Sequence, residues 1–174
     1  MTYTKSNLKR IITEHLDFPK KGIVFKDVLP LLQHPEIFSK VIKEMSSSYV
    51  VKNADAILSI DARGFIFGTA ISLYLSKPMV VARKPGKLPG ELIEKSYDLE
   101  YGRNSLTIQK DSVKQYKSFV IVDDLLATGG TALCAYNMLI DLKKEITGLS
   151  VVIELGELKG KEKFTFPVDS MLVL

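Results

Sequence analysis

The chain has 174 residues, 46% of them hydrophobic and 25% charged, which is enough for one globular domain with a substantial core. Its single cysteine, Cys134, excludes a disulfide within the chain, and no apolar run approaches the roughly 18 residues that a membrane span needs. The net charge of +4 is compatible with an anionic small ligand, and the sequence has no dense Lys/Arg block of the kind that binds nucleic acid. The first residues are polar and lack a signal-peptide pattern. We therefore expect a soluble cytoplasmic protein.

Apolar residues recur at helical spacing in four segments, and shorter apolar runs lie between them. The spacing predicts helices over residues 6–16, 36–49, 63–76 and 131–144. The short runs predict buried strands over residues 56–60, 79–82, 119–123 and 149–155, and the alternating residues 105–109 suggest a further strand. Residues 17–27 are rich in loop formers. This order predicts one α/β domain over residues 1–174, with a central, mostly parallel sheet flanked by helices.

Two details of the fourth helix follow from its pattern. Cys134 falls among apolar residues, so we expect a buried small side chain rather than a reactive thiol. Lys143 and Lys144 are expected in the last turn, where positive charge favours the helix dipole.

The stretch "VIVDDLLATGGT", residues 120–131, places two acids, Asp123 and Asp124, at the carboxyl end of a buried strand, where ligands of parallel sheets bind. Adjacent carboxylates suit a pair of neighbouring hydroxyls or a hydrated Mg²⁺. The small residues and threonines that follow, residues 127–131, open a helix whose N-terminus favours a phosphate. The stretch therefore predicts a site for ribose 5-phosphate, the alternative being a surface turn with two solvated acids.

Cationic residues follow two other strands. "SIDARGF" leads from a strand into a helix and carries Arg63, whose planar fork can grip a diphosphate, unless it is an ordinary surface arginine. "RKPGKLPG" supplies Arg83, Lys84 and Lys87, which need either an anion or open water.

These segments resemble a known family. "VIVDDLLATGGT" resembles the phosphoribosyl diphosphate (PRPP) motif of the type I phosphoribosyltransferases, and further segments appear in the order found in the adenine phosphoribosyltransferases. The segments are "DFPKKGIVFKD", "DARGFIFG", "RKPGKLPG", "SYDLEYG" and "ELGELKGKEKF". The resemblance implies the type I phosphoribosyltransferase fold, with a base-binding hood over about residues 1–35 and a flexible flap over about residues 95–104.

The resemblance also implies an activity. It is that of a pentosyltransferase of purine salvage, in which adenine and PRPP give AMP and diphosphate with Mg²⁺ as cofactor, in a homodimer. Mg²⁺ would be held mainly by PRPP and diphosphate, with Asp123 and Asp124 nearby. Two alternatives are a phosphoribosyltransferase for a 6-oxopurine and a non-catalytic PRPP-sensing regulator. No nucleic acid or membrane is expected as a partner.

Residue roles follow from the resemblance position by position. Asp123, Asp124, Arg63 and the flap residue Glu100 match catalytic positions, Glu100 acting near N7 of the purine. The 5′-phosphate would lie on Ala127, Thr128, Gly129, Gly130 and Thr131. Diphosphate would contact Asp61, Ala62, Arg63, Gly64, Arg83, Lys84 and Lys87. The last three would face the diphosphate either of their own subunit or of a partner subunit. Adenine would lie between Phe25 and Leu155, its edge read by the backbone of Val24 and Lys26.

Three features of this match concern single positions. Ala62 stands where the family usually has serine, so one hydroxyl contact to the diphosphate is missing. Lys26 stands where the family usually has arginine. The family often has a cis peptide bond in the diphosphate loop, and the matching bond here is Asp61–Ala62.

Overall fold

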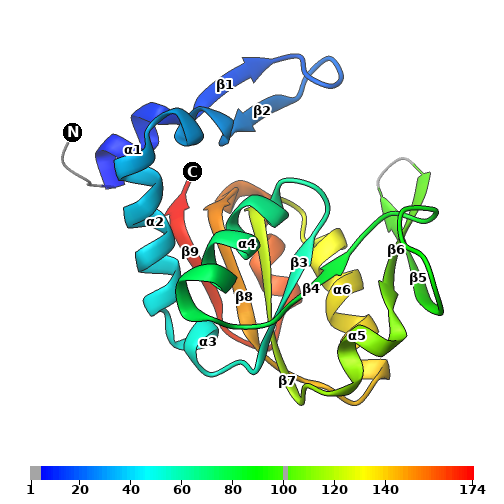
Figure 1. Ribbon diagram of the computed structural model, residues 1–174. Helices are drawn as coiled ribbons and strands as arrows, with labels where there is room; N and C mark the ends of the chain where they lie inside the picture. The colour runs from blue at the N-terminus through cyan, green and yellow to red at the C-terminus, as the bar shows by residue number, and fades with distance from the viewer. Residues whose placement is uncertain (1–4, 100–101) are drawn as a thin grey trace.

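The computed structural model describes residues 5–99 and 102–174, and its centre is a parallel sheet of five strands (Figure 1). The strands are β3 (Ala56–Ile60), β4 (Met79–Ala82), β7 (Ser118–Leu126), β8 (Glu145–Glu154) and β9 (Val168–Val173). Their order is β4-β3-β7-β8-β9, and each neighbouring pair is parallel. The predicted α/β architecture is confirmed.

Helices cover both faces of this sheet. The face-forming helices are α2 (Pro35–Ser47), α3 (Tyr49–Lys52), α4 (Gly64–Leu75) and α6 (Gly130–Asp141). In strand β7, Val120 and Val122 share a buried cluster with α2 and α4, whereas Phe119 and Ile121 share one with α6, where Cys134 is buried as expected. A strand covered on both sides must be apolar at consecutive positions, which is why it reads as an unbroken apolar run. Within the described residues, no helix is long and apolar enough to cross a membrane.

Two antiparallel hairpins stand outside the sheet (Figure 1). The first joins β1 (Thr13–Leu16) to β2 (Val24–Asp27), within the residues expected to form a hood, and the second joins β5 (Leu92–Leu99) to β6 (Gly102–Gln109), across the expected flap. Short helices complete the described chain: α1 (Lys5–Ile11), α5 (Lys110–Lys114), η1 (Leu29–Gln33), η2 (Gly156–Leu158) and η3 (Gly160–Lys163).

Helix α4 lies unusually close to the sheet, and two of its glycines allow this. A Cβ on Gly64 would lie 2.9 Å from Asp123 Oδ1, and one on Gly68 would lie 2.4 Å from Ser59 Oγ. The close approach brings the start of α4 to the carboxyl end of β7, so Arg63 and Asp123 come from elements that touch.

Several sequence-based boundaries are corrected. The prediction of one helix over residues 6–16 is wrong, because α1 ends at Ile11 and the next residues form β1, which pairs with β2 in the expected loop. All four residues of β1 are exposed, so the apolar side chain of Leu16, which completed the helical pattern, does not pack into the core. The expected helix 36–49 breaks at Ser48, whose ψ of 142° is extended. Strand β9 was not predicted.

The lysines expected in the last turn of α6 lie beyond it. The helix ends at Asp141, and Lys143 turns the chain with a φ of 58°. The ammonium group of Lys144 instead donates to the carbonyl of Tyr116 at 2.7 Å. The Lys144 ammonium group therefore binds a backbone carbonyl of another segment and does not interact with the dipole of α6.

Candidate active site

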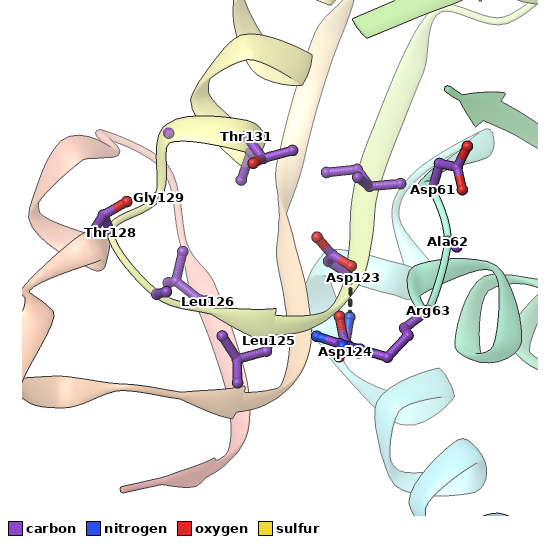
Figure 2. A pocket seen from close by; sticks show the side chains of 14 residues that line it. Asp61, Ala62, Arg63, Asp123, Asp124, Leu125, Leu126, Thr128, Gly129 and Thr131 are labelled. Carbon is purple, nitrogen blue, oxygen red and sulfur yellow. Dashed lines mark hydrogen bonds and ion pairs between the residues drawn. The ribbon is translucent and has the colours of Figure 1, made fainter. Parts of the chain in front are cut away.

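Two carboxylates lie near the carboxyl end of β7, three and two residues before its last residue, Leu126, because the strand extends beyond the predicted end at Asp123. The backbone N–H of Asp124 donates to Asp123 Oδ1 at 2.8 Å, and Arg63 Nε donates to Asp124 Oδ2 at 2.5 Å (Figure 2). Asp124 is 5% exposed, so Arg63 supplies the charge that a buried carboxylate needs. Burial, together with the adjacent Asp124 carboxylate, raises the pKa of Asp123 well above its usual value, against the smaller opposing effect of Arg63.

The loop after β7 curls around a cavity of about 380 Å³. The cavity is lined by residues 60–63 and 123–132, which include the expected phosphate residues 127–131. Gly129 is the N-cap of α6 and has a φ of 80°, a conformation that side chains disfavour. The helix therefore begins with its N–H groups at the cavity, as a phosphate site requires.

The opposite wall of the cavity is the loop between β3 and α4. The Asp61–Ala62 peptide bond is cis, as the resemblance implied. Arg63 is the N-cap of α4, and its guanidinium carbon lies 4.9 Å from the centre of the Phe25 ring. Figure 2 shows this loop across the cavity from residues 123–131. Two predicted binding segments, about 60 residues apart in the chain, thus face each other.

The basic residues after β4 divide into two kinds. Arg83 Nε donates to Asp61 Oδ2 at 2.9 Å, so it supports the loop rather than lining the cavity. Lys84 and Lys87 are exposed and also lie outside the cavity lining. Their expected contact with diphosphate stays a prediction.

The expected adenine residues do not share one cavity. Val24, Lys26 and Leu155 line a second cavity of about 620 Å³. Thr128 also lines it and belongs to residues 127–131, the expected phosphate loop. Phe25 points to the other side of β2, where it packs edge-on against Phe18 with ring centres 5.1 Å apart. A base held between Phe25 and Leu155 is therefore not preformed, and this assignment stays a prediction. The Lys26 ammonium forms an ion pair with Glu14 across the hairpin.

Sequence reasoning missed two residues that contact the phosphate loop. The hydroxyl of Tyr97, on β5, accepts a hydrogen bond from Thr131 Oγ1 at 3.1 Å. Gly160 packs so closely that its added Cβ would lie 2.1 Å from the carbonyl oxygen of Ala127. Both contacts join segments about 30 residues apart, which no local pattern reveals. Glu100 lies outside the described residues.

The acidic residues of the cavity bear on how a divalent cation could be held. Among residues 5–99 and 102–174, no three His, Cys, Asp or Glu side chains gather as a ligand set. Two carboxylates of the cavity already have a cationic partner, since Asp124 is paired with Arg63 and Asp61 with Arg83. A cation here would need most of its oxygen ligands from a bound anion.

Comparison with known proteins places the chain in a family. The phosphoribosyl transferase domain model matches residues 28–168. The adenine phosphoribosyltransferase of Prochlorococcus marinus strain MIT 9211 is 64% identical over 166 residues, 95% of this chain and 96% of the relative. This chain belongs to the adenine phosphoribosyltransferase family.

Solved structures of the adenine phosphoribosyltransferase family have the same fold. The protein of Thermoanaerobacter pseudethanolicus superposes with a TM-score of 0.92 at 38% identity, over 98% of this chain and all (100%) of the other. The protein of Saccharomyces cerevisiae, solved with adenine and an imino-altritol bisphosphate, has a TM-score of 0.89 at 35% identity, covering 97% and 98%. The type I phosphoribosyltransferase fold is confirmed.

Proposed function

We propose that this enzyme transfers the 5-phosphoribosyl group of PRPP to N9 of adenine, forming AMP and releasing diphosphate. The observation that carries the proposal is the single cavity in which the Asp123–Asp124 pair and the phosphate loop face the cis-peptide loop of Arg63. One wall suits a ribose 5-phosphate and the other suits its diphosphate, so the cavity fits the two ends of one PRPP molecule.

These residues would lower the reaction barrier by stabilising charge that develops in the transition state. As the bond from C1′ to diphosphate loosens, positive charge develops on the ribose and negative charge on the leaving group. The carboxylates of Asp123 and Asp124 would hold the ribose hydroxyls beside the positive charge. Arg63 donates to Asp124 through Nε, so its terminal nitrogens have further N–H donors for the diphosphate. Catalysis then rests on position and charge rather than on a covalent intermediate.

The choice of adenine would come from the hood. A backbone carbonyl of Val24 or Lys26 can accept a hydrogen bond from the 6-amino group of adenine. It cannot pair with a 6-oxo group, because both groups only accept hydrogen bonds. The name of the Prochlorococcus relative and the adenine bound to the yeast relative support this choice. Closure of the hood would have to bring Phe25 toward Leu155, since the two line different cavities. Glu100 would act near the purine ring.

Mg²⁺ would enter with PRPP. The diphosphate oxygens would supply most of its ligands and Asp123 would stand nearby, and the ion neutralises charge on the leaving group. We also propose a cytoplasmic homodimer, on the strength of the family resemblance. Sedimentation of the purified protein measures the oligomeric state, and a monomer at assay concentration would contradict the dimer.

The test of the function is AMP formation from PRPP with a panel of free bases, each with Mg²⁺ and with a chelator. We expect turnover with adenine and Mg²⁺, with hypoxanthine and guanine slower by at least about 100-fold, since a mismatched polar group leaves a buried partner unpaired. A preference for hypoxanthine supports the 6-oxopurine alternative. PRPP binding without turnover of any base supports the regulator.

A further inference from the structure

Tyr97 makes a long-range contact to the start of α6. Thr131 Oγ1 donates to the Tyr97 hydroxyl at 3.1 Å, although 34 residues separate them. Thr131 lines the cavity at the start of α6, and Figure 2 shows it above Asp123. The proposed function gives Thr131 to the 5′-phosphate, but it gives Tyr97 no role.

The position of Tyr97 is fixed by the strand that carries it. The ammonium group of Lys95, on the same side of β5, pairs with Asp141, and Cys134 Sγ contacts the Lys95 carbonyl at 3.3 Å. Thr131, Cys134 and Asp141 lie on one face of α6, at spacings of about one and two turns. Strand β5 therefore lies along α6, and the phenol is held at the N-terminus of the helix by more than its own hydrogen bond.

The chemistry of the two hydroxyls makes this contact relevant to phosphate binding. A threonine hydroxyl has one proton, and a phosphate oxygen only accepts. When Thr131 gives its proton to phosphate, the contact with Tyr97 persists only if the phenol turns and donates to Thr131 Oγ1. A chain of donors then runs from Tyr97 through Thr131 to the phosphate, and each bond polarises the next.

We propose that Tyr97 is a positioning residue for the 5′-phosphate and acts through the Thr131 hydroxyl. This inference rests on the proposed function, which assigns the phosphate to residues 127–131. Phenylalanine at position 97 keeps the ring in place but cannot donate to Thr131. The expected loss is that of one hydrogen bond, or about 3- to 10-fold in affinity for a 5′-phosphate.

The experiment is calorimetric titration of Tyr97→Phe with ribose 5-phosphate and, separately, with diphosphate. We expect the Kd for ribose 5-phosphate to rise about 3- to 10-fold. The Kd for diphosphate should not change, because diphosphate is assigned to the opposite wall. In the AMP assay, KM for PRPP should rise and KM for adenine should stay constant. Tyr116→Phe is the matched control, since that hydroxyl also has a partner, Gln115 Nε2 at 2.8 Å, and lies next to the other end of β7.

A double-mutant cycle tests whether the effect passes through Thr131. In a Thr131→Val background, Tyr97→Phe should cause no further loss of ribose 5-phosphate affinity. An unchanged Kd in Tyr97→Phe overturns the inference, and so does an equal weakening of both ligands, which would indicate a general disturbance of the fold. If the unaltered enzyme itself does not bind ribose 5-phosphate, the phosphate site of the proposed function fails first, and the inference fails with it.

Discussion

Gly160 offers a way to move the expected phosphate loop, residues 127–131, without changing any residue of the loop itself. This residue begins η3 and is buried against the loop after β7. A Cβ at position 160 would lie 2.1 Å from the Ala127 carbonyl oxygen and 3.1 Å from the Gly129 nitrogen. Both atoms belong to backbone, which cannot rotate away as a flexible side chain could. The substitution Gly160→Ala must therefore displace either the loop or η3.

The size of the displacement follows from the contact. Carbon and carbonyl oxygen approach to about 3.3 Å even in favourable contacts, so the Gly160→Ala change requires a shift of roughly 1 Å. A misplacement of about 1 Å in a positioning element can cost on the order of 100-fold in rate, or about 2.7 kcal/mol of transition-state free energy. We expect kcat/KM for PRPP to fall by about this factor, and the affinity for ribose 5-phosphate to fall with it.

The assay is AMP formation over a range of PRPP, together with calorimetric titration with ribose 5-phosphate and thermal unfolding. Gly156→Ala is the matched control: its Cβ would meet Val173 Cγ1 at 3.1 Å and the Leu174 carbonyl oxygen at 3.7 Å, away from the loop. It should leave PRPP kinetics nearly unchanged. A folded Gly160→Ala enzyme with an unchanged KM for PRPP and unchanged ribose 5-phosphate binding contradicts this prediction, because the loop would then tolerate the shift.

Substitutions at four further positions test individual side chains. Asp123→Asn should slow AMP formation by about 2–4 kcal/mol in activation free energy. Because the pKa of Asp123 is raised in the folded state, the stability that its protonated form contributes is complete below the pKa of the unfolded chain and is lost as pH rises through the folded pKa. The Tm of Asp123→Asn should therefore fall less than that of the unaltered protein as pH rises from the pKa of the unfolded chain through the folded-state pKa, and parallel Tm profiles over that range would contradict the raised pKa. Arg63→Ala should raise KM for PRPP and lower kcat while leaving Asp124 buried without its cation; an effect on adenine KM alone would place Arg63 at the base. Ala62→Ser should tighten diphosphate inhibition by at most about 1.5–3 kcal/mol, and unchanged inhibition would mean that another group fills that contact. Glu100→Gln should keep much of the activity and Glu100→Leu little if the residue positions the purine by hydrogen bonds, whereas rates that are equally poor in both variants point to proton transfer.

Much of the fold and of one wall of the cavity could be predicted from the sequence, because the signals are local. A buried strand, two acids and a run of small residues lie within twelve consecutive positions, 120–131, and the backbone geometry of a strand leading into a helix follows from them. The same holds for residues 61–64. The resemblance of these segments to the motifs of the type I phosphoribosyltransferases implied the family, because each motif is a short continuous run of residues.

How these segments meet depends on contacts between parts of the chain that are far apart in sequence. Strand order places β3 beside β7, and the bare Cα atoms of Gly64 and Gly68 let α4 approach, so Arg63 reaches Asp124 across 61 positions of sequence. The pairing of Thr13–Leu16 with β2 overrode a helical pattern, because hydrogen bonds between strands depend on a partner segment that side-chain spacing does not describe. The contacts of Tyr97 and Gly160 with the phosphate loop have the same origin. The residue types indicate which groups can bind a phosphate or a ribose, whereas packing between distant segments brings some of these groups into one cavity and buries particular charges together.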